Sequence, residues 1–336
     1  MRKARKFATP PVMIATASVV GREEKEGPLG SLFDLCDPTD TFGARTPELG
    51  EGEMERLCLN TALTKASLSQ EDLDILVAGD LQNQCLGTYG GLYSMGVPFI
   101  GIYGACSTCT EGIMLLSELI SGGADMGAAV TGSHNSVAER QFRGPLEYGS
   151  QRSPSSQWTA TAAGAAILCS PDCKQASSSP VRVTEYMAGR PISSGSLDQS
   201  NMGGAMAFSA FDTLVRYFSS SDTRYTDLDL IVTGDLGRVG SDILRYLLEP
   251  RYPGISSRLC DCGLMLYDRE RRDAHSGGSG CGCSASVLAS YLYPKLRDGN
   301  LRDILFLSTG AIMSVSSVQQ GCPIIGITPL IRIRRY

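Results

Sequence analysis

The sequence predicts an α/β protein built from two similar halves, and three observations support this. Residues 73–81 read LDILVAGDL and return as LDLIVTGDL at residues 228–236, identical at six of nine positions. A turn of small residues with cysteine at residues 104–109 is echoed at residues 280–285. In both halves predicted strands alternate with predicted helices, which indicates a mostly parallel sheet covered by helices. A long unit present only twice favours two packed halves over a solenoid.

The first half begins with an apolar run at residues 10–20, which predicts a buried strand. Residues 21–50 are rich in glycine, proline and charge, so we expect an insertion with turns. Apolar residues at every fourth position predict a helix over residues 51–66. The remaining elements of this half are expected to be strands at residues 73–78, 97–103 and 126–131 and a helix at residues 107–120.

Residues 133–157 form a long polar segment that we interpret as a functional loop, because long loops inside compact domains seldom lack a role. Residues 170–180 carry prolines and a serine run and predict the junction between halves 1–170 and 171–336. The second half is expected to have strands at residues 181–187, 228–233, 263–267 and 304–308 and helices at residues 205–218, 241–248 and 284–293.

Composition excludes several classes of protein. The 336 residues include 35 acidic and 30 basic side chains, and the net charge of −5 argues against a nucleic-acid partner. Twelve cysteines without a secretory signal indicate reduced thiols. No stretch approaches the ~20 apolar residues that a membrane span needs. We therefore expect a soluble protein, or one held at a surface by a partner.

Cys106 is the first candidate functional residue, because it lies between a predicted strand and a predicted helix. The N–H groups and dipole of a helix N-terminus lower the pKa of a thiol and attract anions. This position favours a nucleophile or an anion site over the alternative, a small buried residue. Cys106 and Cys109 have the spacing of a redox or metal pair, but the other cysteines do not repeat it. No metal or cofactor is expected.

The chain has two histidines, His134 and His275. His134 follows the strand after the Cys106 helix, so it could face the same end of the sheet and act as a base. His275 lies in a glycine-rich and serine-rich approach to the second cysteine turn. For each histidine, a hydrogen bond within its loop is the alternative.

Asp80 and Asp235 end the two repeated strands, at the edge where parallel sheets place their ligands. Asp80 suits a polar wall of a site, whereas Asp235 is expected only to cap the next turn. Arg140 and Arg143 would bind carboxylates through their planar guanidinium groups. Pairing of these arginines with neighbouring glutamates is the alternative.

Several motifs resemble the stage V sporulation protein AD family over nearly the whole chain. They lie at residues 26–30, 32–34, 78–81, 104–108, 133–135, 138–143, 261–265 and 277–281. More broadly, the duplicated halves with a cysteine at the head of the first half's helix resemble the thiolase and ketoacyl-synthase fold. The resemblance implies a thiolase-like five-layered α-β-α-β-α sandwich.

The family resemblance implies a sporulation protein that binds dipicolinic acid, with or without calcium. Its partners would be the membrane subunits of the SpoVA assembly, and its place the inner forespore membrane, to which it would attach peripherally. The resemblance puts Asp80 and Cys106 in the ligand pocket, with His134 and Asn135 close by. Because Asp80 would repel a bare dianion, we expect it to be protonated or to meet the ligand through calcium.

Condensing enzymes of this fold carry a histidine at one of two places, which here correspond to residues 234–238 and 277–283. Neither segment contains a histidine, and His275 falls just before the second. We therefore expect a binding protein rather than an enzyme. The alternatives are an acyltransferase or thioesterase with Cys106 as nucleophile and His134 as base, and a purely structural subunit. Thiolase-like relatives commonly dimerise through the first half, so a homodimer is a further expectation.

Overall fold

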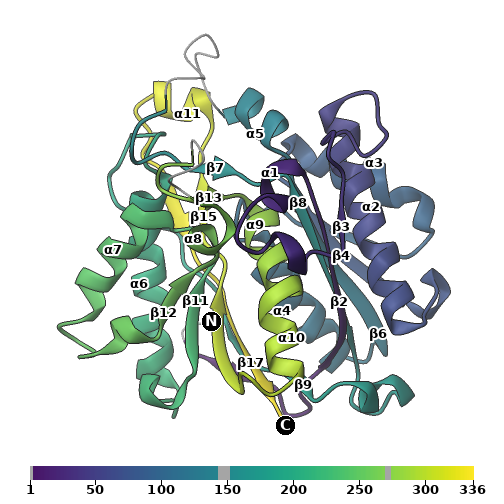
Figure 1. Cartoon of the computed structure of the whole chain (residues 1–336). Helices are drawn as coiled ribbons and strands as arrows, with labels where there is room; N and C mark the ends of the chain where they lie inside the picture. The colour runs from purple at the N-terminus through teal and green to yellow at the C-terminus, as the bar shows by residue number, and fades with distance from the viewer. Residues whose placement is uncertain (1–2, 143–151, 269–273) are drawn as a thin grey trace.

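The computed structural model describes residues 3–142, 152–268 and 274–336 (Figure 1). The strands of the first half are β2 (Val12–Val20), β4 (Ile75–Gly79), β5 (Phe99–Gly101), β6 (Met126–Ser133) and β8 (Ala162–Cys169). Those of the second half are β9 (Val181–Met187), β11 (Leu230–Thr233), β12 (Leu259–Asp261), β14 (Asp303–Leu307) and β17 (Leu330–Arg335). These ten strands follow one another in a single sheet, in the order β12-β11-β14-β17-β9-β2-β8-β6-β4-β5.

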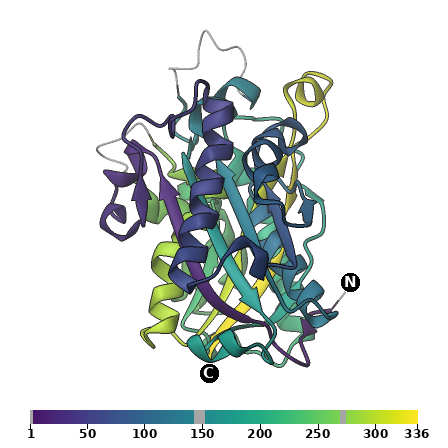
Figure 2. The same ribbon diagram turned by 90° about the vertical axis from the view of Figure 1, so that its right-hand side faces the viewer.

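The helices form three layers around this sheet. The main ones are α2 (Pro47–Ala66), α3 (Leu86–Leu92), α4 (Thr108–Ser121), α6 (Met202–Ser220), α7 (Gly237–Leu248), α9 (Cys281–Val287) and α10 (Tyr293–Arg297). The two halves of the sheet enclose α4, α9 and α10, while α2 and α3 cover one outer face and α6 and α7 the other. Figure 2 shows α2 lying along the outer face of the first half. The expected five-layered arrangement is confirmed.

Shorter elements gather mainly at the upper end of the molecule in Figure 1. They are β1 (Arg5–Lys6), α1 (Arg22–Lys25), β3 (Leu35–Cys36), α5 (Asn135–Phe142), β7 (Trp158–Thr159), β10 (Ile192–Ser193), α8 (Cys262–Leu266), β13 (Gly278–Ser279), β15 (Gly310–Ile312), α11 (Val315–Gln319) and β16 (Ile325–Ile327). β7 pairs with β13 across the two halves, and β10, β16 and β15 form a separate small sheet.

The two halves of the sheet have the same topology. In the first half β4 pairs in parallel with β5 and β6, and β8 runs antiparallel to β6 and β2. In the second half β11 pairs in parallel with β12 and β14, and β17 runs antiparallel to β14 and β9. The expectation of a mostly parallel sheet is therefore wrong, since among these ten strands each half has two parallel and two antiparallel pairings. The sequence did not predict β8, because its residues, AAGAAILC, are mostly alanine and glycine, which have a low preference for strands.

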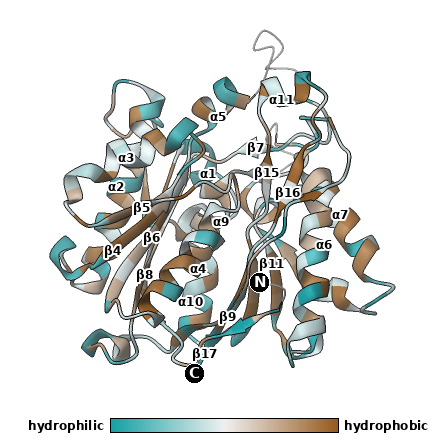
Figure 3. Cartoon of the chain, turned by 180° about the vertical axis from the view of Figure 1, so that it is seen from behind, coloured by the Kyte–Doolittle hydropathy of each residue, from teal (hydrophilic) through white to brown (hydrophobic). Residues whose placement is uncertain are grey.

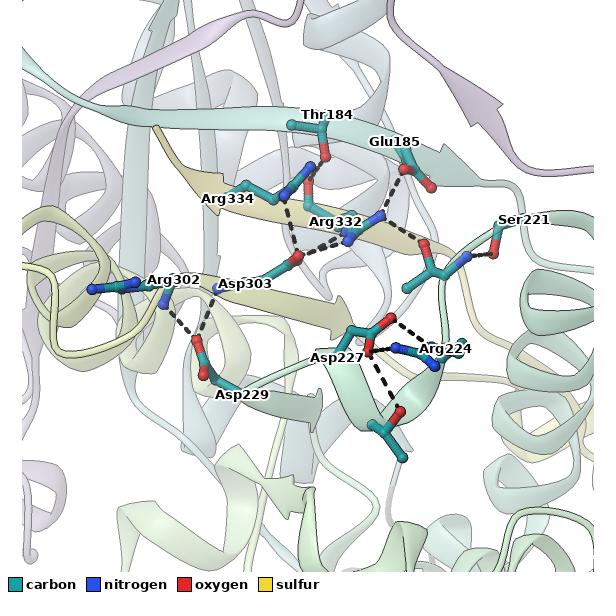
Figure 4. A network of polar contacts seen from close by, with 12 residues as sticks. Thr184, Glu185, Ser221, Arg224, Asp227, Asp229, Arg302, Asp303, Arg332 and Arg334 are labelled. Atoms are coloured by element: carbon teal, nitrogen blue, oxygen red, sulfur yellow. Dashed lines mark hydrogen bonds and ion pairs between the residues drawn. The ribbon is translucent and has the colours of Figure 1, made fainter.

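The repeated strand motif has one structural role that is identical in both halves. Asp74 Oδ2 accepts hydrogen bonds from two backbone N–H groups at the start of β6, at 2.7 and 3.0 Å. Asp229 Oδ2 accepts two at the start of β14, at 2.6 and 3.0 Å (Figure 4). Each aspartate thus ties its own strand to the neighbouring parallel strand. This is a physical reason for the Leu-Asp pair that opens both copies.

Three apolar clusters hold the layers together. The central one packs α4 and α9 between the halves and includes Ile113 and Phe306. The second lies between α2 and the first half, around Met54, and the third between α6 and the second half, around Met206. Figure 3 shows the apolar colouring concentrated on the strands and the inward helix faces. Within the described residues, no helix is both long and apolar enough to cross a membrane.

Two sequence-based expectations about local structure are wrong. Residues 133–157 were expected to be a loop, but residues 135–142 of this segment form α5. Residues 263–267 were expected to be a strand, but they fall largely in α8. The side chain of Asp261 accepts a hydrogen bond from Leu264 N at 3.2 Å and so starts this helix. The strand of that region is β12, which comes just before it.

The predicted division between residues 170 and 171 lies in the connection between β8 and β9. This connection carries a short 3₁₀ helix, Lys174–Ser178. The division stays a prediction, because the sheet runs on through the pairing of Val12 in β2 with Arg182 in β9.

Candidate functional site

Cys106 lies in the turn between β5 and α4, where the sequence predicts it. Ala105 has φ of +51°, in the left-handed region that non-glycine residues seldom adopt. Two hydroxyls hold the turn in place, because Ser107 Oγ donates to Gly104 O and Thr108 Oγ1 donates to Ala105 O, both at 2.7 Å. Strained backbone of this kind is often found at functional sites. The turn presents Cys106 to the second half of the molecule.

The second half meets Cys106 with a hydrogen-bonded cluster. Cys106 Sγ lies 3.8 Å from Ser279 Oγ, and the Asp235 carboxylate is also within hydrogen-bonding reach of the thiol. Asp235 Oδ2 accepts from Ser279 Oγ at 3.1 Å and from Gly280 N at 3.0 Å. Asp235 Oδ1 accepts from Thr309 Oγ1 at 2.6 Å. All four of these polar side chains are buried.

The environment of Cys106 favours the neutral thiol. Burial raises the pKa of Cys106 well above its ordinary value, and the negative charge of Asp235 raises it further. Burial also raises the pKa of Asp235 to about 6, against the opposing effect of its hydrogen bonds. The sequence-based expectation of a lowered thiol pKa at the helix N-terminus is therefore wrong. Loss of solvent and a neighbouring carboxylate outweigh the helix dipole here.

A cavity of about 240 Å³ opens beside Cys106 at the end of the molecule where α5, β7, β13 and β15 meet. Both halves contribute to its wall. Its apolar lining consists of Leu81, Ala105, Ala138, Phe142, Met202, Ala311 and Met313. Its polar lining consists of Cys106, Glu139, Ser153, Ser156, Gln157, Thr159, Gln199, Ser200 and Ser279. Among these described lining residues, Glu139 is the one carboxylate and none is a lysine or arginine.

Asp80 and Asp235 have exchanged the roles that the sequence suggests for them. Asp80 Oδ1 accepts from Gln82 N, and Asp80 Oδ2 accepts from the backbone N–H and hydroxyl of Thr88, all at 2.6 Å. Its carboxylate therefore holds the turn into α3 and does not line the cavity. Asp235, expected to be only a turn cap, is the aspartate that reaches Cys106.

His134 and Asn135 lie behind the cavity rather than in it. His134 is buried, with Nε2 at 2.8 Å from Asp40 O and with Nδ1 accepting from Ser136 N at 3.2 Å. Burial lowers the pKa of His134, which favours a neutral ring. Asn135 Nδ2 donates to Thr159 O at 3.1 Å and so supports the cavity wall from outside. His275 is exposed, and neither histidine lines the cavity.

The arginines fall into three cases. Arg140 is half exposed on α5, forms an ion pair with Glu48 at 2.9 Å and does not line the cavity. Arg143 lies outside the described residues. Arg152, which the sequence did not single out, is buried against the cavity wall, where Arg152 Nη2 lies 3.0 Å from Glu139 Oε1.

The described residues contain no group of three or more histidine, cysteine or acidic side chains arranged to hold a metal ion. All twelve cysteines, each within the described ranges, are free thiols. The Cys106 and Cys109 pair is divided between two environments. Cys106 faces the cavity, whereas Cys109 belongs to the central apolar cluster.

Asp235 and Ser279 are the site residues that sequence reasoning missed, and the internal repeat holds a signal for Asp235 alone. Asp235 occupies the same place in its copy of the repeat as Asp80 does in the other. Ser279 precedes α9 by two residues, just as Cys106 precedes α4 by two, but this correspondence is visible only once the helix starts are known. In the structure, Cys106 of the first half faces Ser279 of the second.

The duplicated halves and the central cysteine define a thiolase-like protein, and known structures support this class. The chain superposes on a variant of the OleA protein of Xanthomonas campestris with a TM-score of 0.61 and 14% identity, covering 98% of this chain and 99% of the other. For 3-oxoacyl-[acyl-carrier-protein] synthase III of Aquifex aeolicus VF5 the TM-score is 0.57 and the identity 14%, with 97% and 100% covered. At this identity the match shows the fold alone.

Within this class, residues 1–334 match the family described as Stage V sporulation protein AD (SpoVAD). The Stage V sporulation protein AD of Bacillus subtilis (strain 168) is 37% identical over 318 residues, which cover 94% of this chain and 91% of that protein. The chain belongs to the stage V sporulation protein AD family. The resemblance seen in the sequence is confirmed.

Proposed function

We propose that this protein binds dipicolinic acid, alone or as calcium dipicolinate, in the cavity beside Cys106. It would act as the binding component of the SpoVA channel complex and serve dipicolinate uptake into the forespore during sporulation. The observation that carries the proposal is the cavity itself, which opens where the two halves of a sporulation family member meet and is lined by both. We propose no cofactor.

The chemistry of the cavity suits a small planar ring with polar substituents. Leu81, Phe142 and Met202 provide apolar contacts for an aromatic face. Hydroxyl and amide groups, such as those of Thr159 and Gln199, can donate hydrogen bonds to carboxylate oxygens. The cavity therefore combines apolar surface with a few orienting polar groups.

Binding without turnover is supported by the state of Cys106. A nucleophilic cysteine acts as the thiolate, and both burial and Asp235 raise the pKa of this thiol. The histidines do not line the cavity, so the expected pairing of Cys106 with His134 receives no support. One observation favours the alternative of an acyltransferase: Asp235 could accept the thiol proton from Cys106.

Calorimetric titration with dipicolinic acid, with and without calcium, tests the proposal. Ala138→Trp should fill the cavity and weaken binding at least tenfold, about 1.4 kcal/mol, because Ala138 lines it. Ser136→Trp is the matched control on the same helix, since Ser136 is exposed, and it should bind like the wild type. No heat at millimolar ligand would contradict the proposal. An acyl adduct on Cys106 after incubation with acyl-CoA would favour the enzyme.

We propose that the membrane subunits of the SpoVA complex hold the protein peripherally at the inner forespore membrane. We also propose a homodimer formed through β5. This strand ends the sheet, so its outer edge is unpaired within the described chain. Exposed apolar side chains lie near it, with Leu86, Tyr89 and Tyr93 exposed by 67%, 50% and 81%. A second copy of the same edge would pair the strand and cover these side chains.

Light scattering coupled to size exclusion tests the dimer. Tyr93→Asp should shift the protein toward the monomer, because a charge would be buried at the centre of the proposed contact. Tyr246→Asp is the matched control, since Tyr246 lies on α7 and is 79% exposed. A wild-type protein that is monomeric at tens of micromolar, or equal behaviour of the two variants, would count against this interface.

A further inference from the structure

Arg152 is a buried cation held directly behind the cavity wall. Its side chain is 5% exposed and its guanidinium lies 4.5 Å above the ring of Trp158. Arg152 Nη1 donates to Gln157 O at 3.3 Å, and Arg152 Nη2 contacts Glu139 Oε1 at 3.0 Å. Glu139 and Gln157 both line the cavity. A stacked, buried arginine of this kind has a fixed position and a fixed direction.

The charge of the cavity does not match its proposed ligand. Dipicolinate carries two carboxylates, whereas the one carboxylate of the described lining, Glu139, is itself negative. Glu139 and a ligand carboxylate would repel each other inside the cavity. A cation beside the ligand would offset this repulsion, and Arg152 is the protein cation that Glu139 already contacts.

We propose that Arg152 recognises a carboxylate of the ligand, and that Glu139 occupies this position in the empty protein. The inference rests on the proposed function and assigns the residue that would recognise a carboxylate of that ligand. On binding, one carboxylate replaces another at the guanidinium, so the buried positive charge remains paired throughout. The Glu139 side chain is 21% exposed, so its carboxylate would turn toward solvent in this exchange rather than into the core. Trp158 keeps the arginine in place during the exchange.

Calorimetry with two probes tests the proposal. Dipicolinate carries the charge that Arg152 would bind, and its neutral analogue pyridine-2,6-dicarboxamide has the same shape without that charge. The wild type should bind dipicolinate at least ten times more tightly than the diamide. Arg152→Gln should lose that preference through weaker dipicolinate binding, while diamide affinity stays constant. Arg140→Gln removes the same charge from an exposed position outside the cavity and should leave both affinities unchanged.

Glu139→Gln provides a second test that leaves the buried arginine intact. Removal of the competing carboxylate should strengthen dipicolinate binding several-fold and leave the diamide unaffected. Thermal unfolding shows whether Arg152→Gln folds. If it does not fold, the dipicolinate affinity of Glu139→Gln tests the role of Arg152 instead. If wild type binds neither probe, the proposed function fails and the inference falls with it. If wild type binds dipicolinate but Arg152→Gln keeps the preference, or Glu139→Gln binds no tighter, only the role of Arg152 is overturned.

Discussion

Replacement of Arg332 by methionine should lower the free energy of unfolding by about 3–5 kcal/mol, the range for breaking a buried ion pair from one side. Arg332 lies on β17 at 8% exposure, in the network that Figure 4 shows. Its Nε and Nη2 donate to the two oxygens of Asp303 at 2.8 and 2.6 Å, and its Nη1 donates to Glu185 at 2.8 Å. Methionine would leave two buried carboxylates without this partner.

The network is important because it joins the strands that close the second half of the sheet. Arg332 on β17 contacts Asp303 on β14 and Glu185 on β9, and Tyr217 OH on α6 donates to Glu185 at 2.7 Å. Arg334 adds a second cation beside Asp303, with 3.1 Å between Nε and Oδ2. Arg334 is less buried than Arg332, so it can compensate for the loss of Arg332 only in part.

Urea unfolding at pH 7 measures the effect. Arg224→Met is the matched control, because Arg224 forms an exposed ion pair with Asp227 in the same part of the molecule (Figure 4). Exposed pairs contribute little to stability, so this variant should unfold close to the wild type. A second test replaces Arg332, Asp303 and Glu185 together by apolar residues, which should recover much of the loss. Equal free energies of unfolding for Arg332→Met and Arg224→Met would contradict the proposed contribution of the buried Arg332 network to stability.

The stability of the protein should fall as the pH rises from about 4 to about 7. Burial raises the pKa of Glu24 and of Asp261 to about 7 each, and that of Asp235 to about 6. At pH values between its pKa in the unfolded state and its pKa in the folded state, each group is protonated in the native protein and releases that proton on unfolding. The native state is therefore favoured at the low end of this window, and the advantage disappears as the pH rises through the folded pKa.

Glu24 is the group with which to test this dependence. Glu24 Oε1 accepts hydrogen bonds from Thr161 N at 3.0 Å and from Tyr267 OH, whereas Oε2 has no hydrogen-bond partner among the described residues. Glu24→Gln keeps the accepting oxygen and removes the buried charge. The shift of the Glu24 pKa from 4.5 to about 7 corresponds to about 3 kcal/mol. Between pH 4.5 and pH 8, the free energy of unfolding should therefore fall less for Glu24→Gln than for the wild type. The difference between the two decreases should be at most this amount.

Urea unfolding at half-unit pH steps provides the measurement. Glu71→Gln is the matched control, because Glu71 is exposed, and its profile should follow that of the wild type. A Glu24→Gln profile as steep as the wild-type profile would show that Glu24 does not hold the proton. Carboxyls with lowered pKa values, such as Asp212 beside its two arginines, act in the opposite sense. Their contribution is lost only at lower pH, as the pH falls through the folded pKa.

The internal repeat made the fold predictable. The strand LDILVAGDL and its copy LDLIVTGDL became β4 and β11, each at the same place in its half of the sheet. The helices α2, α4 and α6 formed where apolar spacing predicted them. Local patterns were sufficient for these elements because the strands are apolar runs rich in isoleucine, leucine and valine and the helices repeat apolar residues along one face. They were insufficient for β8, because its residues, AAGAAILC, are mostly alanine and glycine, which have a low preference for strands.

The amino-acid sequence was enough to establish the class of fold, the family and the position of Cys106 at a strand-to-helix turn. Packing of the two halves sets which side chains surround that cysteine. Asp235 and Asp80 occupy the same position in the two copies of the repeat, yet only Asp235 reaches Cys106, because Thr88 and Gln82 bind the carboxylate of Asp80. The site lies where the halves meet, so its members are far apart in the chain. Their directions depend on how the halves pack, which no local pattern records.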